Sequence, residues 1–193
     1  MSTEAKARNE TISDWIGDIV ALESHVEEAM DKQLSLKSSD ASVTGHFKTF
    51  HDAVRDSKHR AVAYQNAYGS TAGNPIIKVG ASLLGKAAGL VDKIRHDSAS
   101  KALRDDYTAY NHLAIGYTML HATALAFKDA DTTEFAKQGM ITYAGLVQHV
   151  NQVIGSAVIA DLASNDDAPA PDTSVSAESR RVVDEVWKTT STS

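Results

Sequence analysis

Cysteine is absent from this 193-residue chain, which excludes disulfide bonds, thiolate zinc sites and cysteine nucleophiles. Only three prolines occur, so long stretches are free of the residue that costs a helix interior about 3 kcal/mol. No run of about 18 apolar residues is present, as a membrane-spanning helix would need. The first ten residues also lack the apolar core of a secretory signal. We therefore expect a soluble, helical, cytoplasmic protein.

A basic surface is missing as well. The formal net charge is −6 and no dense run of lysine and arginine occurs, so we expect no nucleic-acid partner. The sequence contains no Walker loop, no Gly-x-Gly-x-x-Gly turn, no Gly-x-Ser-x-Gly elbow and no zinc-protease motif. These absences favour a protein that is not an enzyme, although they leave metal chemistry in a helical core open.

Apolar residues recur at three- and four-residue spacing, which predicts long amphipathic helices. We place four of them at 11–34, 43–68, 98–128 and 132–162, with a flexible segment at 1–10. Thr11 or Ser13 is expected to cap the first helix, and Asp131 or Thr132 the fourth. The predicted fold class is all-α, an up-and-down four-helix bundle over residues 11–163.

Two segments lie outside this pattern. Residues 76–95 combine an apolar stripe with three glycines, which favours an extra crossover helix packed closely on the bundle. A helix lying on a membrane surface and an irregular crossover are the alternatives. Residues 164–193 begin as a flexible linker and end in a short helix at 177–188. Its apolar side chains would anchor a partner protein or dock on the bundle itself.

Polar residues on the predicted inner faces are candidates for a metal site. Di-iron bundles take a carboxylate from each of two helices and a Glu-x-x-His pair from each of the others. Glu23 lies within the apolar stripe of the first helix, and Asp106 and His121 share the stripe of the third. Each would be a metal ligand or a core polar group held by an ion pair or hydrogen bond. For Glu23 that partner would be a core tyrosine, a histidine or a lysine, with Lys58 as one candidate.

Further histidines are weaker candidates. His51 lies near the stripe of the second helix and His149 at the edge of the fourth. Asp56 and His59 have the carboxylate-x-x-His spacing, but a helical wheel directs them away from Phe47 and Phe50, towards solvent.

Two runs of sequence resemble a known family. They are WIGDIVALESHVEEAM at residues 15–30 and YNHLAIGY at residues 110–117. Both are similar to helices of the ferritin-like, stress-associated four-helix-bundle proteins of the YciE/YciF type. The resemblance implies a ferritin-like bundle that binds iron or manganese, with Glu23 as a ligand. The family's other carboxylates fall near Thr108, Asn111, Thr142 and Tyr143 here, which implies a degenerate or incomplete site.

Three functional hypotheses follow. The leading one is a stress-associated, ferritin-like bundle that self-associates as a homo-oligomer and acts as a structural or interaction protein. The second is an oxidase-like bundle that binds iron or manganese. The third is a membrane-surface protein that acts through residues 76–95.

Overall fold

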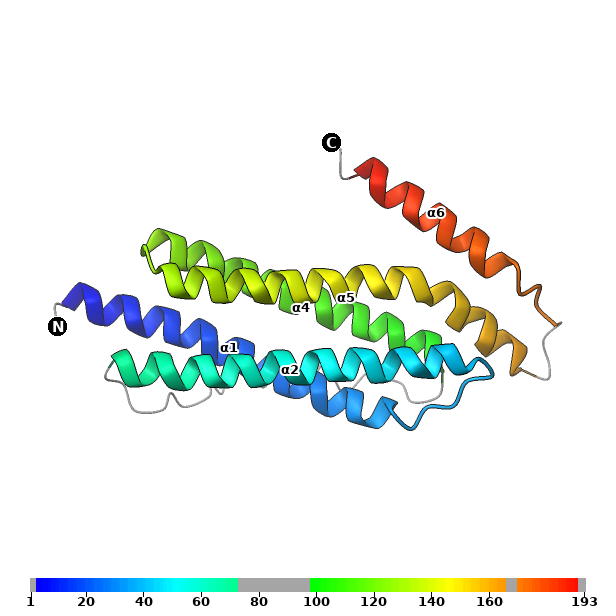
Figure 1. Ribbon diagram of the computed structural model, residues 1–193, viewed down its shortest axis with the longest axis horizontal. Helices are drawn as coiled ribbons and strands as arrows, with labels where there is room; N and C mark the ends of the chain where they lie inside the picture. The colour runs from blue at the N-terminus through cyan, green and yellow to red at the C-terminus, as the bar shows by residue number, and fades with distance from the viewer. Residues whose placement is uncertain (1–2, 73–97, 166–169, 191–193) are drawn as a thin grey trace.

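The structure, a computed structural model, describes residues 3–72, 98–165 and 170–190 (Figure 1). Within these ranges every regular element is a helix, which confirms the predicted all-α class. The helices are α1 (Thr3–Gln33), α2 (Ala41–Ala72), α4 (Ala99–Ala126), α5 (Ala130–Ala163) and α6 (Val175–Thr190). The segment 76–95, predicted as a crossover or membrane-surface helix, lies outside the described residues. None of the described helices is long and apolar enough to cross a membrane.

Four helices begin earlier than predicted: α1 by eight residues, and α2, α5 and α6 by two each. The segment before residue 11 is rich in Ala, Lys, Arg and Glu, which are good helix formers, so α1 extends back to Thr3. Thr11 therefore does not cap α1 but lies inside it, where its hydroxyl donates to the carbonyl of Ala7 at 2.9 Å. Ser13, the other predicted cap, is buried in α1. The N-cap of α5 is Asp129, whose carboxylate accepts from the Thr132 amide at 3.0 Å. The predicted caps Asp131 and Thr132 already belong to the helix.

Contacts between the helices fix their directions. Residues early in α1 meet residues late in α2, as the pairs Asn9–Tyr68 and Asp31–His51 demonstrate, so these helices are antiparallel. Helices α1 and α4 are also antiparallel, as the pairs Gln33–Asp106 and Glu23–Tyr117 demonstrate. Helices α4 and α5 are antiparallel as well, through the pairs Tyr117–Gly139 and Ser98–Asp161. Consequently α2 and α4 run parallel, which differs from a strictly alternating bundle (Figure 1). The chain passes from the end of α2 to the distant start of α4 through residues 73–97.

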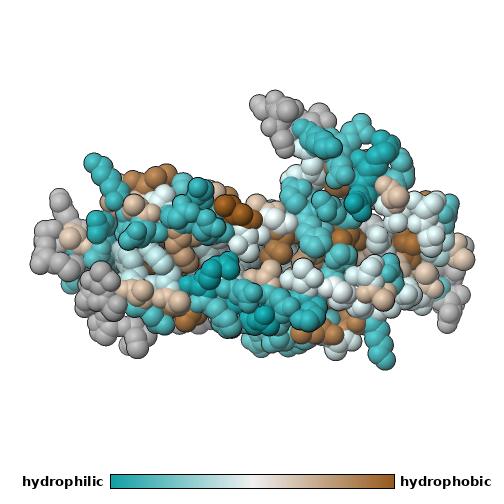
Figure 2. All heavy atoms as spheres, in the orientation of Figure 1, coloured by the Kyte–Doolittle hydropathy of each residue, from teal (hydrophilic) through white to brown (hydrophobic). Residues whose placement is uncertain are grey.

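One hydrophobic core joins α1, α2, α4 and α5. It contains the stripes that the sequence predicts, with these large side chains fully buried: Ile12, Ile16, Met30, Phe47, Phe50, Leu103, Tyr110, Leu113, Tyr117, Leu120 and Tyr143. Charged and polar residues cover most of the outer surface of α1 and α2, as the teal band across the middle of Figure 2 illustrates. The core therefore lies along the bundle axis, and polar groups buried in it need partners there.

The C-terminal helix α6 packs mainly against α5 (Figure 1). The two helices come close at Gly155, where a Cβ atom would lie 3.3 Å from the hydroxyl of Ser179. The short helix predicted at 177–188 is thus present, with slightly wider bounds. Val182 remains 43% exposed on it, so α6 leaves part of its apolar surface uncovered by the described residues.

Candidate functional site

The most unusual feature of the core is a buried carboxyl group held by three hydroxyl groups. Glu23 of α1 has no exposed surface. Its Oε1 atom accepts hydrogen bonds from Ser57 Oγ at 2.7 Å, Tyr143 OH at 2.8 Å and Tyr117 OH at 2.9 Å. Each donor comes from a different helix, so α1, α2, α4 and α5 all meet at this level. We call Glu23, Ser57, Tyr117 and Tyr143 the core cluster.

The position of Tyr117 depends on a glycine of α5. A Cβ atom at Gly139 would come within 2.5 Å of the Tyr117 ring, closer than side chains approach one another. The ring also stacks on that of Tyr143 with 5.8 Å between centroids. Gly139 thus lets α4 and α5 approach closely enough for both phenols to reach the same carboxylate oxygen.

Burial determines the protonation of the core cluster. It raises the pKa of Glu23, while the hydrogen bonds from Ser57, Tyr143 and Tyr117 act in the opposite direction. Burial and the neighbouring carboxyl raise the pKa of Tyr143 well above its usual value, and that of Tyr117 as well. Both phenols therefore remain protonated and donate. The Oε2 atom of Glu23 has no hydrogen-bond partner among the described residues.

A second buried carboxyl lies further along α4. Asp106 is 1% exposed, and its Oδ1 atom accepts from the Gln33 side-chain amide at 2.7 Å. Burial raises its pKa to about 7, because one amide donor and no cation compensates the lost solvation. The sequence placed Glu23 and Asp106 correctly in the core. The structure gives each its own set of partners.

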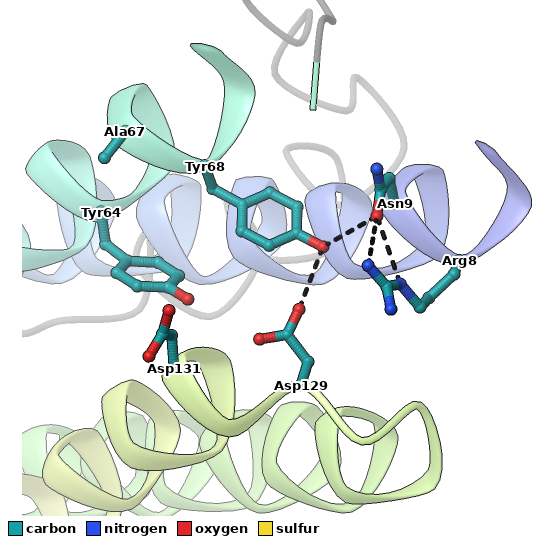
Figure 3. A pocket seen from close by; sticks show the side chains of 7 residues that line it. All are labelled: Arg8, Asn9, Tyr64, Ala67, Tyr68, Asp129 and Asp131. Carbon is teal, nitrogen blue, oxygen red and sulfur yellow. Dashed lines mark hydrogen bonds between the residues drawn. The ribbon is translucent and has the colours of Figure 1, made fainter. Parts of the chain in front are cut away.

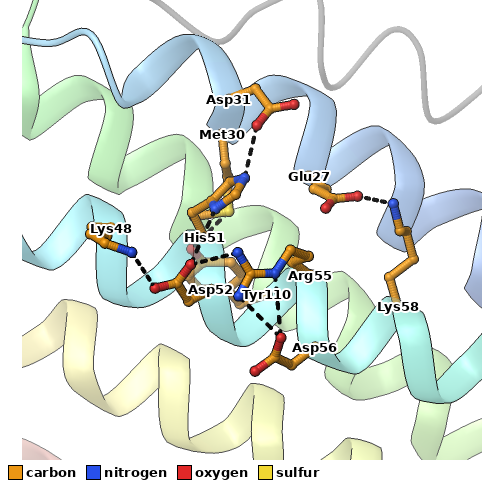
Figure 4. Close-up of polar contacts among 10 residues, drawn as sticks. All are labelled: Glu27, Met30, Asp31, Lys48, His51, Asp52, Arg55, Asp56, Lys58 and Tyr110. Atoms are coloured by element: carbon orange, nitrogen blue, oxygen red, sulfur yellow. Dashed lines mark hydrogen bonds and ion pairs between the residues drawn. The ribbon is translucent and has the colours of Figure 1, made fainter.

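The lysine expected near Glu23 pairs elsewhere. Lys58 forms its ion pair with Glu27, one turn along α1 from Glu23 (Figure 4). The reason is that Lys58 lies at the edge of the α1–α2 interface, where its ammonium group keeps contact with solvent. The neighbouring residue Ser57 is the one that points to the core.

The histidines that the sequence singled out as metal ligands are separated from one another. His51 pairs with Asp31 of α1 through Nε2 at 2.8 Å (Figure 4), and the partly buried His149 packs against His46 and Phe50. Burial, and then the nearby His46, lower the pKa of His149, which favours a neutral ring. His121 is partly buried on α4 and belongs to neither group.

The carboxylate-x-x-His pair faces outwards, as the helical wheel predicts. Asp56 and His59 are exposed on α2, and Asp56 accepts from Arg55 (Figure 4). Neither residue contacts the core cluster. Across residues 3–72, 98–165 and 170–190, no group of three or more His, Asp or Glu side chains is close enough to hold a metal ion.

The core cluster itself does not fit a di-metal centre. Such a centre in a helical bundle needs several carboxylates and histidines directed at one point. Here one carboxyl meets a serine and two protonated phenols, which offer it hydrogen atoms. Asp106, the other buried carboxyl, faces an amide group.

Two surface cavities lie beside the α2–α5 interface. One of about 310 Å³ is lined by Ser57, Arg60, Tyr117, Asp131, Glu134, Phe135, Gln138 and Gly139, so its floor includes two members of the core cluster. The other, of about 320 Å³, is lined by Arg8, Asn9, Tyr64, Ala67, Tyr68, Asp129 and Asp131 (Figure 3). The stacked rings of Tyr64 and Phe135, with centroids 4.1 Å apart, separate the two.

Sequence reasoning overlooked two of the residues that hold the buried carboxyls. Ser57 falls on the spacing of Phe50, Val54 and Ala61, and Gln33 continues the stripe of Val26 and Met30. A count of polar residues on the inner stripes, without regard to charge, would have found both.

Comparisons with known proteins add no relative: no protein-family model, no curated protein and no solved structure matches this chain.

Proposed function

We propose that this protein is a ferritin-like bundle in which hydrogen-bonded hydroxyl groups replace the metal centre, and that it works as a self-associating structural or interaction protein. One observation carries the proposal: the groups that meet Glu23 from α2, α4 and α5 are Ser57, Tyr117 and Tyr143. Three hydrogen-bond donors occupy the inner positions where metal chemistry needs ligands.

The order of the helices supports the ferritin-like part of the proposal. Ferritin-like folds contain one long crossover connection within a four-helix bundle. A parallel α2 and α4 require a connection of that kind, and residues 73–97 provide the necessary length of chain. The stress association rests on the family resemblance alone.

The core cluster has a structural role in this proposal. A buried carboxyl is costly unless it is satisfied, so only the arrangement that brings all three hydroxyl groups to Glu23 avoids that cost. Shifting any one helix by a turn would leave Glu23 with fewer donors. The cluster would thereby fix the mutual register of four long helices whose apolar stripes alone discriminate poorly.

Metal analysis combined with point variants tests the proposal. Protein from cells supplemented with iron or manganese should contain far less than one metal ion per chain. Tyr143→Phe removes one donor to a buried carboxyl and should lower the free energy of unfolding by about 1–3 kcal/mol. Tyr107→Phe is the matched control, because Tyr107 is only partly buried and does not reach Glu23.

The metal-binding hypothesis remains the second candidate, since Oε2 of Glu23 and Oδ2 of Asp106 are both buried without a partner among the described residues. It predicts stoichiometric iron or manganese that Glu23→Gln abolishes, with Glu28→Gln, an exposed carboxyl on the same helix, as the control. That result would overturn the replacement of the metal centre. The membrane-surface hypothesis concerns residues 76–95 and stays a prediction.

A further inference from the structure

Two adjacent helices share a long surface without charge. No Asp, Glu, Lys or Arg occurs in α4 from residue 107 to 127, or in α5 from residue 138 to 160. By contrast, charged residues recur along the whole of α1 and α6. In a chain with 23% charged residues, long helices normally carry charge on the side that faces water. Depletion of charge on an exposed surface is typical of the centre of a protein interface.

Large apolar side chains lie on this surface. Ile115 of α4 is 55% exposed and Ile141 of α5 is 57% exposed. They lie at the same level of the bundle, because Tyr117 and Gly139, two residues away on each helix, are in contact. Met119 and Leu125, which are 45% and 56% exposed, extend the apolar surface along α4. We call the exposed residues of 107–127 and 138–152 the uncharged face.

We propose that the uncharged face is the surface on which a second copy of this chain packs, about a two-fold axis. This inference rests on the proposed function, whose self-association it assigns to a defined surface. In a two-fold interface the same patch meets itself, so a carboxylate or ammonium group near the axis would face its own copy. The uncharged face avoids such like-charge pairs, which copies with a net charge of −6 would otherwise form.

The polar groups on the uncharged face suit pairing with themselves. Apart from the exposed imidazole of His112, they are amides and hydroxyls, including the exposed Asn111, Thr118, Gln148 and Gln152. Amide and hydroxyl groups both donate and accept hydrogen bonds, so each can pair with its own copy. A nucleic acid or another strongly charged partner would instead require side chains of the opposite charge.

The size of the uncharged face is sufficient for a dimer. The segment 107–127 extends about 31 Å and the segment 138–152 about 22 Å, and each helix is about 10 Å wide. Each copy would therefore bury roughly 540 Å², or about 1,080 Å² in total, which is just above the ~1,000 Å² expected of a specific interface.

The mass of the full chain in solution, measured by sedimentation velocity over a wide concentration range, tests this assignment. The wild type should sediment with twice the 20.7 kDa mass of one chain. Ile115→Glu/Ile141→Glu places four carboxylates in the interface and should reduce the mass to that of one chain. Leu34→Glu, at a residue 47% exposed beyond the end of α1, is the control and should leave the dimer intact.

The outcomes separate this inference from the proposed function. A wild type that stays a single chain overturns both the assignment and self-association, but not the replacement of the metal centre. A dimer that the double variant leaves unchanged overturns only the assignment to the uncharged face. If the double variant loses its helical circular dichroism, its mass no longer reports on the interface, and cysteine cross-linking tests the assignment instead. The native chain has no cysteine, so a single introduced cysteine reports only on its own position. A short bismaleimide should link Ile141→Cys copies and not Leu34→Cys copies, and the reverse would overturn the assignment.

Discussion

Gly139→Ala and Gly145→Ala are the same substitution on the same helix, and we expect opposite effects on stability. In an exposed helix interior, replacing glycine with alanine stabilises by about 0.5–1 kcal/mol, because alanine loses less backbone entropy on folding. No atom lies within 4 Å of a Cβ placed at Gly145, so the full gain is expected there. At Gly139 the new methyl group would overlap the Tyr117 ring, within 2.5 Å of it.

The Tyr117 ring is held in its position by its neighbours. It is 1% exposed, it stacks on Tyr143, and its hydroxyl group donates to Glu23 at 2.9 Å. Moving the ring to an ordinary contact distance would stretch that hydrogen bond. Overpacking costs about 1–3 kcal/mol and a hydrogen bond to a charged group contributes about 1.5–3 kcal/mol. After the helix-propensity gain is subtracted, Gly139→Ala should lower the free energy of unfolding by roughly 1.5–5.5 kcal/mol.

Urea unfolding followed by circular dichroism at pH 7 measures both variants against the wild type, and unchanged m-values would show that the unfolded states are comparable. A Gly139→Ala protein as stable as the Gly145→Ala protein would refute the reasoning. It would mean that Tyr117 does not lie against α5, and that the close approach of α4 and α5 at the core cluster is wrong.

Three further perturbations probe other parts of the molecule. Asp161→Ala should lower the free energy of unfolding in urea by about 1–2 kcal/mol, because the carboxylate accepts hydrogen bonds from the Ala99 and Ser100 amides at the start of α4. Asp172→Ala is the control and should have little effect, since its carboxylate accepts from the amide of Ser174, two residues away. Since the pKa of Asp106 is raised to about 7, its contribution to stability is complete below about pH 4 and declines by about 1.4 kcal/mol per pH unit as pH rises to about 7. Asp106→Asn should flatten that decline in unfolding measured from pH 4 to 8, and an unchanged slope would argue against it. Deleting residues 165–193 should preserve the helical circular dichroism and melting of the remaining helices, because α6 packs mainly on α5 and contributes no residue to the core. Loss of folding would place the tail in the core.

Much of the fold follows from the spacing of apolar residues. The four long helices were predicted, and apart from the start of α1 their ends lie within four residues of the predicted bounds, since each has an inner stripe such as that of Ile12, Ile16 and Met30. Their ends were less predictable. α1 begins at Thr3 because residues with high helix propensity continue on the N-terminal side of its first buried residue, Ile12. A stripe of apolar residues marks only the buried part of a helix.

The core cluster was predictable only in part. Glu23 is conspicuous because it is a carboxylate within an apolar stripe, and a core tyrosine was among its expected partners. Ser57 attracted no attention because a serine on an inner face is small and uncharged. The choice between Lys58 and Ser57 depends on about one residue of helix rotation, which a pattern of periodicity does not resolve.

The arrangement of the core cluster also bears on how the chain folds. Short loops join α1 to α2 and α4 to α5, so each pair can form as a hairpin from contacts close in sequence. Glu23 and Ser57 belong to the first hairpin, and Tyr117 and Tyr143 to the second. The hydrogen bonds from Tyr117 and Tyr143 to Glu23 therefore form only when the two hairpins dock, which brings together segments far apart in the sequence. If docking is the final step, losing a phenol will accelerate unfolding while scarcely slowing folding. On that order of events, the buried carboxyl stabilises the docked pair of hairpins, and it affects the rate of unfolding more than the rate of folding.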